Sequence, residues 1–363
     1  MDSSSCTRHT RYLTESFINP PGVGASDFYR DVTLGASRSR LEGSLIIPCG
    51  DDAVEFVAKH HSDLSVHYLL ERQSPKLQLE LLDKLSTLEK ARRAGLDIPN
   101  FWDVRSIDEL GTHLPEATYP LMLKPYHTYL LHNLEKRKYR LADNEPEVLR
   151  QGRELFAHGI EFMLCEMIPG PDSQNCSYYT YRDEHGKEYL SLTKRCVRRN
   201  PINEGAGTYQ LTDRIPDVAD AGKRFFDSID YKGYGSIEFK RDPRDNSLKV
   251  MECNNRFTAV TAQIIESGAN VALLTYADVT GQSIEPIEQY ETEIGYWSPY
   301  YDFKAFQEVK RRDSSKSWSD WGRSIIHSRT VFPYFDWRDP FPYCVIQSQQ
   351  IRRGLARVFA RRS

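Results

Sequence analysis

Three polar side chains in the stretch YGSIEFKRDPRDNSLKVMECNNRF, residues 234–257, have the types and spacing to bind a metal ion. The stretch reads as two strands joined by the turn-forming loop DPRDN. A register that pairs Lys240 with Val250 also pairs Glu238 with Glu252, with Cβ atoms about 4.5–5.5 Å apart. Opposed like charges among apolar neighbours are destabilising, so we expect a cation or a proton between the two carboxylates.

The same face of the second strand carries two further polar groups. Asn254 lies on the face of Glu252, because strand side chains alternate with period two. Two carboxylates and an amide oxygen are hard ligands suited to Mg²⁺, with phosphate oxygens completing the shell. Arg256 comes one step further along this face and is placed to meet an anion. The alternative interpretation is a solvated hairpin with scattered charges.

Two lysines and an acid are placed to meet a nucleotide if one binds there. Lys124 ends the apolar strand YPLMLKP, a position typical of a phosphate contact, although a lysine that simply leaves the core is as common. Lys84 lies in the helical stretch LLDKLSTLEKARRAG, where a surface charge is the simpler interpretation. CEMIPGPD is a strand followed by a backbone break and Asp172; such a strand end can pair with adenine, and the acid with a ribose hydroxyl.

Composition and the absence of other motifs exclude several classes of protein. The 363 residues indicate two or three lobes, and a net charge of −3 argues against a dedicated nucleic-acid binder. No apolar run reaches the ~18 residues that span a bilayer, and because MDSSSCTRHT has no apolar h-region we expect no secretory signal there. The seven scattered cysteines include no CxxC pair and indicate reduced thiols in a cytoplasm. The motifs GxxxxGK[ST], HExxH and GxSxG are absent.

The pattern along the chain predicts a mixed α/β protein. Two strands around a helix near the N-terminus indicate a βαβ unit with a parallel sheet. A β-hairpin is expected around His185-Gly186. The expected strands are 11–17, 43–50, 67–72, 119–125, 161–170, 234–241 and 248–256. The expected helical stretches are 51–64, 74–99 (closed by Gly95), 217–235 (a helix and its exit), 262–281 and 349–363.

The chain resembles the ATP-grasp enzymes, and within them the predicted carboligases that are similar to D-aspartate ligase. The segments that carry the resemblance are DKLSTLEKARRAGLDIP, YPLMLKP, CEMIPGPD, GYGSIEFKRDPRDNSLKVMECNNRF and FDWRDPFP. The resemblance implies an α/β fold of the α+β ATP-grasp type, with a shortened Rossmann-like N-terminal lobe and a two-lobed ATP-grasp domain of antiparallel sheets. The implied domains are 1–115 (pre-ATP-grasp lobe and linker helix), 116–185 (small lobe with lid), 186–290 (large lobe with the metal site) and 291–363 (C-terminal extension).

The resemblance also implies the contacts of ATP. Lys84 and Lys124 would contact its phosphates. Glu166 and Ile168 would form the hinge strand whose backbone meets adenine, and Asp172 would bind the ribose.

The metal and catalytic roles follow from the same resemblance. Glu238, Glu252 and Asn254 would hold one or two Mg²⁺ ions, with Mn²⁺ as a substitute. Arg256 would steady the anionic substrate or the transferred phosphoryl group. Lys194 would lie near the phosphates, and the loop EGAGT at 204–208 would cover the acceptor.

Two features depart from the family pattern. The N-terminus lacks the usual first apolar strand and glycine-rich turn, which puts the acceptor site in question. The lid segment 126–143 contains no glycine; among its side chains we select Lys138 as the phosphate contact in place of a glycine-rich backbone.

The activity that the resemblance implies is an ATP-dependent carboxylate–amine ligase, an enzyme that forms C–N bonds through an acyl phosphate. Its substrates would be ATP, a small carboxylate and an amine, with an amino acid or a small peptide-like compound among them. No nucleic-acid partner is expected, a homodimer is among the expectations, and the location is the cytoplasm. The first alternative is a non-catalytic ATP-binding or scaffold protein on the same fold. The second is a basic-tail interaction protein without a nucleotide.

The basic C-terminal stretch QQIRRGLARVFARRS leaves its role open. It has the composition of an amphipathic helix. A helix that docks on the protein or is solvated is the simplest interpretation; contact with an anionic membrane surface or with nucleic acid are the alternatives.

Overall fold

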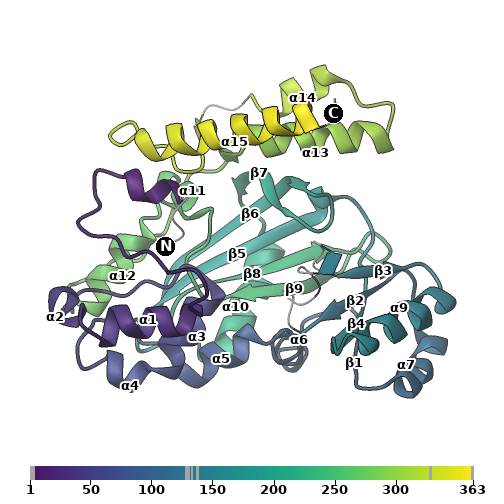
Figure 1. Ribbon diagram of the computed structural model, residues 1–363, viewed down its shortest axis with the longest axis horizontal. Helices are drawn as coiled ribbons and strands as arrows, with labels where there is room; N and C mark the ends of the chain where they lie inside the picture. Colours follow the sequence, from purple (N-terminus) through teal and green to yellow (C-terminus); the bar gives the residue numbers. More distant parts are fainter. Residues whose placement is uncertain (1–4, 127–130, 132–133, 136–138, 327–328, 361–363) are drawn as a thin grey trace.

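The computed structural model describes residues 5–126, 131, 134–135, 139–326 and 329–360, and from residue 353 onward only the backbone is considered. Along the chain, a helical N-terminal segment is followed by a small sheet, a large sheet and a group of C-terminal helices (Figure 1). Lys138 lies outside the described residues.

The N-terminal segment is built of short helices. Their core is formed by Phe56, Val57, Leu64 and Tyr68. The expected strands 43–50 and 67–72 are reduced to a single parallel bridge between Leu45 and Leu69. The prediction of a strand at 11–17 was wrong; the segment forms turns. The elements are η1 (Cys6–His9), α1 (Ala25–Leu34), α2 (Arg38–Leu41), α3 (Asp51–Lys59), α4 (His61–Leu64), α5 (Pro75–Leu82) and α6 (Lys84–Arg93).

The predicted helix 74–99 is in fact the two helices α5 and α6. Asp83 has an extended backbone between them, and its carboxylate accepts a hydrogen bond from the backbone N–H of Ser86, which makes it the N-cap of α6. Lys84 is therefore the first residue of a helix and not a charge in its middle. The chain leaves α6 through Gly95, whose φ of +72° is one that glycine tolerates best.

The small sheet has four antiparallel strands in the order β1-β4-β2-β3. Helices α7 and α9 cover one face, and the core between them includes Leu110, Leu121, Leu123, Phe162 and Leu164. The elements are β1 (Phe101–Val104), α7 (Ile107–His113), η2 (Leu114–Glu116), β2 (Leu121–Pro125), β3 (Arg140–Ala142), α9 (Glu145–Ala157) and β4 (Phe162–Glu166).

The large sheet has seven strands in the order β11-β10-β7-β6-β5-β8-β9, antiparallel except for the β10–β11 pair. Its alternation is visible on β5, where Tyr178 packs in one core cluster with Phe225 of α10, while Tyr179 packs in the other with Ile264 of α11. The strands are β5 (Asn175–Arg182), β6 (Glu188–Asn200), β7 (Ala206–Asp213), β8 (Gly233–Arg241), β9 (Leu248–Asn254), β10 (Ile294–Trp297) and β11 (Arg329–Val331). The helices of this part of the chain are η3 (Asp172–Gln174), α10 (Pro216–Ser228), α11 (Thr261–Glu266), α12 (Val271–Val279), α13 (Pro299–Arg312), α14 (Trp318–Ser324) and α15 (Phe341–Ala360).

Several sequence predictions have outcomes in this sheet. The hairpin around His185-Gly186 is confirmed by the pairing of β5 with β6. The predicted helix 262–281 is broken into α11 and α12, because Gly268 has a φ of +101° and Asn270 caps the second helix. The domain boundaries stay a prediction; by strand pairing β1, before residue 116, belongs to the small sheet, and β5, before residue 186, belongs to the large one.

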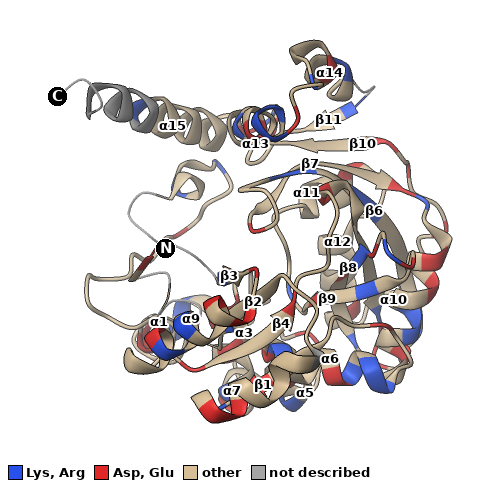
Figure 2. Cartoon of the chain, turned by 90° about the vertical axis from the view of Figure 1, so that its right-hand side faces the viewer, with Lys and Arg blue, Asp and Glu red and all other residues tan. Residues whose placement is uncertain are grey.

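One buried carboxylate fastens the C-terminal helices to the large sheet. Asp302 of α13 is 0% exposed and accepts hydrogen bonds from Arg198 Nε (2.7 Å) and Nη2 (2.9 Å) on β6. Thr208, Trp297 and Trp321 donate three further hydrogen bonds to the same carboxylate. Helices α13, α14 and α15 thus gather beside β7 and β10, as Figures 1 and 2 show from two sides. Within the described residues, no helix combines the length and apolar character needed to cross a membrane.

Candidate functional site

A cleft of about 360 Å³, called the central cleft below, lies between the small and the large sheet. A single core cluster joins its two walls, with Met122 and Met163 from the small sheet and Ile237 and Val250 from the large one. Six of the predicted site residues line the cleft: Lys84, Lys124, Ile168, Asp172, Glu238 and Glu252. The structure therefore brings predicted residues from five separate segments of the chain together in one cleft.

One row of the large sheet carries the charges at the bottom of the cleft. Across β6, β5, β8 and β9, the residues Lys194, Ser177, Glu238 and Glu252 lie directly opposite one another. The predicted pairing of Glu238 with Glu252 is confirmed. The pairing of Lys240 with Val250 was wrong: the register shifts by one after Glu238, so that Phe239 lies opposite Val250. This bulge leaves Met251 as the extra residue, and Met251 also lines the cleft.

The two glutamates have opposite electrostatic surroundings. Surrounding protein and the charge of Glu238 raise the pKa of Glu252, while Lys124 and Lys84 act in the other direction. The side chain of Glu252 is nevertheless exposed, and it lines the cleft. Burial alone would raise the pKa of Glu238, but Arg199 and Lys194 outweigh it and hold that pKa below its ordinary value. Of the two glutamates, Glu252 therefore has the less compensated negative charge, as expected of a carboxylate that binds a cation.

The hinge between the sheets is held by a lysine that the sequence did not single out. Lys240 Nζ donates to the carbonyl oxygens of Ile168 (2.8 Å) and Gly170 (3.1 Å). Ile168 lines the cleft, whereas Glu166 is not among the lining residues. The carboxylate of Glu166 instead forms an ion pair with Arg244 at 2.6 Å, and its backbone N–H donates to the carbonyl of Asn100.

Asp172 lies at the other end of the hinge segment and is buried. Both of its carboxylate oxygens accept from the backbone N–H of Asn203, each at 3.2 Å. Burial raises the pKa of Asp172, against this hydrogen bond and the charge of Arg199. The contact ties the hinge to the loop after β6, which therefore forms part of the cleft wall.

Three predicted residues lie next to the cleft without lining it. Lys194 is 4% exposed, donates to Gln210 Oε1 and has its pKa lowered by burial. Asn254 is buried opposite Ser236, two positions beyond Glu252 on the same strand. Arg256 Nε donates to Asp51 Oδ1 at 2.6 Å, and Asp51 does line the cleft.

Arg199 is the main functional candidate that the sequence did not reveal. It lines the cleft, and its Nη2 donates to Glu238 Oε2 at 2.9 Å. Strict alternation from Lys194 would place Arg199 on the opposite face of β6. Two register shifts, between Cys196 and Arg198 and between Arg198 and Arg199, bring it to the side of Glu238. A β-bulge of this kind has no clear signature in a single sequence.

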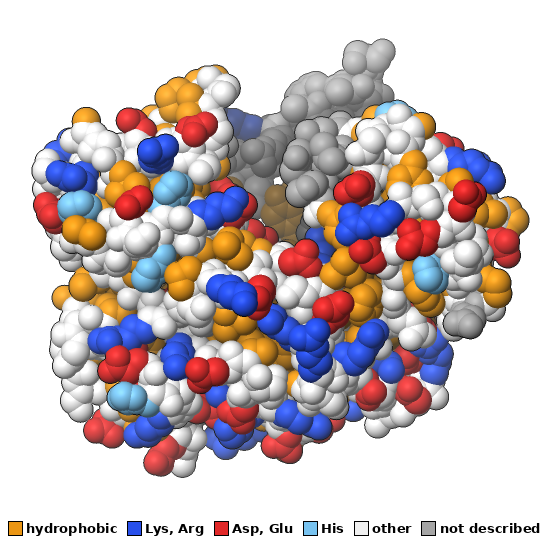
Figure 3. Space-filling view, turned by 90° about the horizontal axis from the view of Figure 1, so that it is seen from below, with side chains coloured by type: hydrophobic (Ala, Val, Ile, Leu, Met, Phe, Trp, Pro, Cys, Tyr) orange, Lys and Arg blue, Asp and Glu red, His pale blue; other side chains and the backbone are white. Residues whose placement is uncertain are grey.

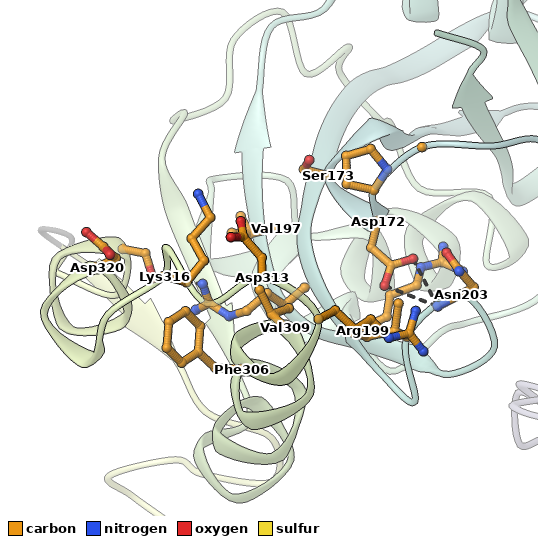
Figure 4. A pocket seen from close by; sticks show the side chains of 16 residues that line it. Asp172, Ser173, Val197, Arg199, Asn203, Phe306, Val309, Asp313, Lys316 and Asp320 are labelled. Carbon is orange, nitrogen blue, oxygen red and sulfur yellow. Dashed lines mark hydrogen bonds between the residues drawn. The ribbon is translucent and has the colours of Figure 1, made fainter.

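A second cavity, of about 620 Å³, lies on the far side of Asp172 and Asn203 against α13 and α14 (Figure 4). Several of its charged groups are already paired within their own segments. Arg312 forms an ion pair with Glu308, and Asp313 accepts from Ser315. On the outer face shown in Figure 3, basic and acidic side chains are interspersed, without a broad area of one sign.

The residues present fit a magnesium ion. Glu238 and Glu252 supply two opposed carboxylates, and the raised pKa of Glu252 marks a negative charge that a cation would compensate. In the described part of the chain, no group of three or more His, Cys, Asp or Glu side chains gathers to form a metal site without help. Phosphate oxygens would therefore have to complete the ligand shell, as is usual for Mg²⁺ beside a nucleotide.

Comparisons with known proteins show which of them this chain is similar to. No protein-family model matches the chain. A D-aspartate ligase from Enterococcus faecium (strain Aus0004) is 25% identical over 291 residues, which cover 76% of this chain and 69% of the ligase.

Two solved structures share the fold. One is the biotin carboxylase domain of 2-oxoglutarate carboxylase from Hydrogenobacter thermophilus, in complex with MgADP, ADP and bicarbonate: the TM-score is 0.61 at 17% identity, covering 77% of this chain and 63% of that one. The other is N5-carboxyaminoimidazole synthetase from Staphylococcus aureus with ADP: the TM-score is 0.57 at 19% identity, covering 78% and 70%. This chain thus spans less than two thirds of the carboxylase domain.

These similarities agree with the two antiparallel sheets and the charged cleft between them. The mixed α/β fold with antiparallel sheets is confirmed. The chain has the ATP-grasp fold and resembles the carboxylate–amine ligases built on it.

Proposed function

We propose that this protein is an ATP-dependent carboxylate–amine ligase that acts through an acyl phosphate, with Mg²⁺, on an amino acid or a small peptide-like substrate. The observation that carries the proposal is the opposed pair Glu238 and Glu252 in the central cleft, with Lys124 and Lys84 lining the same cleft. The similarity to a D-aspartate ligase and to structures solved with ADP supports it.

The chemistry explains why such a site concentrates charge. A carboxylate is a poor electrophile, so the γ-phosphoryl group of ATP is first transferred to a carboxylate oxygen, which forms an O–P bond and releases ADP. The amine nitrogen then attacks the carbonyl carbon, phosphate departs with the C–O bonding electrons, and the nitrogen loses a proton. The protein positions the reactants and stabilises the charge that develops.

The roles of the residues follow from their places. Glu238 and Glu252, with Asn254 beside them, would hold Mg²⁺, which neutralises phosphate charge when bound. Lys84 and Lys124 would contact the phosphates from the opposite wall. When the metal ion binds Glu238, Arg199 would give up its ion pair with this glutamate and contact the transferred phosphoryl group instead.

The remaining contacts are those of the nucleotide and the substrate carboxylate. The backbone around Ile168 and the carboxylate of Asp172 would bind adenine and ribose, with Lys240 fixing the hinge. Arg256 and Lys194, as close neighbours of the cleft, would add positive charge. Glu166 stays a prediction without a lining position to support it, and Lys138, outside the described residues, stays a prediction as well.

The finer expectations remain part of the proposal. They are one or two metal ions, Mn²⁺ as a substitute, a homodimer and a cytoplasmic location; the seven cysteines, all free thiols, support a reducing compartment. Contact of α15 with a membrane surface or nucleic acid stays an open alternative.

The experiment that tests the function is trapping of the acyl phosphate. The protein is incubated with Mg·ATP, an amino-acid pool and hydroxylamine, which converts an acyl phosphate into a stable hydroxamate. With hydroxylamine in large excess over the amines of the pool, we expect hydroxamate and ADP to form in nearly equal amounts, and neither to form with Glu252→Ala. Glu285→Ala, which removes an exposed glutamate after α12, is the matched control and should keep wild-type yield.

ADP release without hydroxamate would contradict the acyl-phosphate route. Binding of ATP with no ADP release for any acid and amine pool would favour the non-catalytic alternative. The ion pair between Arg199 and Glu238 gives that alternative its structural support, because it occupies a predicted metal ligand.

A further inference from the structure

Helix α15 turns amide side chains toward the rest of the protein. Gln350 is 8% exposed, and Gln347 and Ile346 line a cavity of about 290 Å³ together with residues of β7 and β10. This cavity is called the neutral pocket below, because among the described residues that line it none is Asp, Glu, Lys, Arg or His. A helix that only covers a core buries its apolar stripe, so two glutamines on the inner side of α15 are unexpected.

The opposite side of α15 exposes apolar side chains. Phe341 is 66% exposed and Ile351 is 62% exposed, and Cys344 and Ser348 between them are exposed as well. The spacing 341, 344, 348 and 351 is that of one helix face, and these four residues are called the outer row below. Positions 355, 358 and 359 continue the same spacing toward the end of α15, and the sequence has Leu, Val and Phe there.

The segment before α15 adds an exposed aromatic ring. Trp337 is 87% exposed, the highest value among the large hydrophobic side chains that the structure describes, and its ring centroid lies 4.9 Å from that of Phe335. Figures 1 and 2 show α15 at the edge of the molecule, on the side away from the small sheet. Residues 337–351 therefore present a tryptophan, a phenylalanine and an isoleucine to solvent.

Positive charge is concentrated in the same part of the chain. Residues 341–363 contain five arginines and neither Asp nor Glu, although the whole chain has 51 acidic and 48 basic residues. Arg352, the neighbour of Ile351 at the end of the outer row, is exposed. An apolar row and charge of a single sign thus occur on one helix.

We propose that α15, together with Trp337, binds the surface of an anionic lipid bilayer and lies parallel to it. Helices that bind in this way combine an apolar face, which enters the boundary between headgroups and acyl chains, with basic residues attracted to anionic headgroups. A tryptophan is favoured at the same depth, because its ring is apolar and its N–H is polar. The inference goes beyond the proposed ligase reaction and does not depend on it.

Two other partners fit this surface less well. A symmetric dimer that pairs α15 with α15 would bring the arginines of the two copies together, and residues 341–363 hold no acid to pair with them. A nucleic acid would attract the arginines through its phosphates but would leave the outer row, with Phe341 and Ile351, in contact with water. An anionic bilayer accommodates both the charge and the apolar row.

The experiment is co-sedimentation of the full chain with lipid vesicles of two compositions. One contains phosphatidylcholine and phosphatidylglycerol in equal parts, and the other contains phosphatidylcholine alone. We expect binding to the anionic vesicles to be at least about tenfold tighter than to the neutral ones, because each arginine near the surface is attracted to the anionic lipid. Added salt should weaken the binding, since it screens this attraction.

Two variants test the two parts of the surface. The double variant Phe341→Ser/Ile351→Ser should lower the affinity for anionic vesicles at least about fivefold, because two apolar side chains no longer leave water. Leu273→Ser, which changes a 59% exposed leucine of α12, is its control. Arg352→Glu should lower the affinity by a similar factor, with Arg224→Glu, an exposed arginine of α10, as control. All four change exposed side chains, so Tm should stay that of the wild type.

Equal binding to the two kinds of vesicle would overturn the proposal, and so would an affinity that neither the double variant nor Arg352→Glu changes. Each of these variants tests the proposal if the other does not fold. Light scattering and a duplex DNA of random sequence cover the other partners. A dimer that the double variant dissociates, without vesicle binding, would assign the outer row to a second copy of the chain. DNA binding that Arg352→Glu weakens, again without vesicle binding, would assign the arginines to nucleic acid.

Discussion

The central cleft and the neutral pocket lie on the two sides of residues 203–208, the end of the loop after β6 and the start of β7, yet they are built from opposite chemistry. The cleft is lined by five carboxylates, those of Asp51, Asp172, Glu204, Glu238 and Glu252, of which Asp51 is paired with Arg256, and by three lysines and Arg199. The pocket holds tyrosines and glutamines and no charged side chain among its described lining. The two regions are also built differently, the first mainly from sheet strands and the second largely from the C-terminal helices and loops.

The difference indicates where each part of the proposed ligase reaction would take place. Phosphoryl transfer needs charge that a metal and a nucleotide can compensate, so unbalanced carboxylates are useful in the cleft. The neutral pocket, which offers no such charge among its described lining, would instead seat α15 and stay outside the reaction. The variants in the following predictions either disrupt one of the two regions and leave the other intact, or disrupt the contacts that join them.

The largest effect is expected from the glutamate pair. Glu238→Ala and Glu252→Ala should each lower Mg·ATP-dependent ADP release at least ~10³-fold, because they remove charge stabilisation of the transferred group. Binding to anionic vesicles through α15, the helix that lines the neutral pocket, should stay unchanged. Steady-state ADP release and vesicle co-sedimentation measure the two; equal loss of both would show that the regions are not separate.

The next effect concerns the connection between them. Asp302→Ala leaves Arg198, itself 8% exposed, without its partner. Breaking such a buried pair typically lowers the free energy of unfolding by about 3–5 kcal/mol. Urea unfolding measures it, with Asp220→Ala, an exposed acid of α10, as control. A loss below about 1 kcal/mol would mean that other contacts hold the C-terminal helices.

A smaller effect is expected from the opposite wall of the cleft. Lys124→Met should weaken Mg·ATP binding about tenfold or more, since a hydrogen bond from a charged donor contributes about 1.5–3 kcal/mol. Titration calorimetry measures it. Lys76→Met changes a lysine whose side chain is 86% exposed, far from the cleft, and should leave the affinity as it is. Equal affinities for all three proteins would remove Lys124 from the phosphate contacts.

The smallest effect is a pH dependence of the ligand-free protein. Because the pKa of Glu252 is raised, the folded state binds more protons than the unfolded state above the ordinary carboxyl pKa. Stability therefore falls as pH rises through that window and levels off above the raised pKa. Glu252→Gln should lack this slope and be more stable at neutral pH by about 1 kcal/mol, the scale of an opposed like-charge pair.

Glu238 should behave in the opposite sense. Its pKa is lowered, so its contribution to stability is present above the ordinary carboxyl pKa and is lost as pH falls toward the lowered one. Tm profiles of wild type, Glu238→Gln and Glu252→Gln across acid and neutral pH separate the two slopes. Parallel profiles would contradict the assignment of unlike surroundings.

The sequence predicted the cleft better than the pocket, for physical reasons. Glu238 and Glu252 are joined by a short hairpin, where period-two alternation and a recognisable turn fix which residues face each other. Even there the bulge at Met251 was not predicted. Arg199 was missed because two register shifts on β6 bring it to the face of Glu238, and local pattern does not encode such shifts.

Apart from the loop EGAGT at 204–208, the neutral pocket had no sequence signal. Its residues come from distant segments around 200–208, 296–301, 333–334 and 346–350, and none carries a motif. Strands β10 and β11, which help to place them, have four and three residues, too few for a clear alternation. Tertiary packing through Asp302 brings the first two of these segments together, and a pattern read along one chain does not contain it.

The most direct test of the central claim is the thermal shift of the protein with Mg²⁺ and ATP together. Binding to the folded state adds RT ln(1 + [L]/Kd) to its stability, about 2.7 kcal/mol at a hundredfold excess over Kd. The account predicts a rise in Tm that requires both Mg²⁺ and ATP, is lost in Glu252→Gln and is kept in Glu285→Gln. A well-folded wild type without a rise, or a full rise in Glu252→Gln, would contradict the placement of the metal and nucleotide in the central cleft.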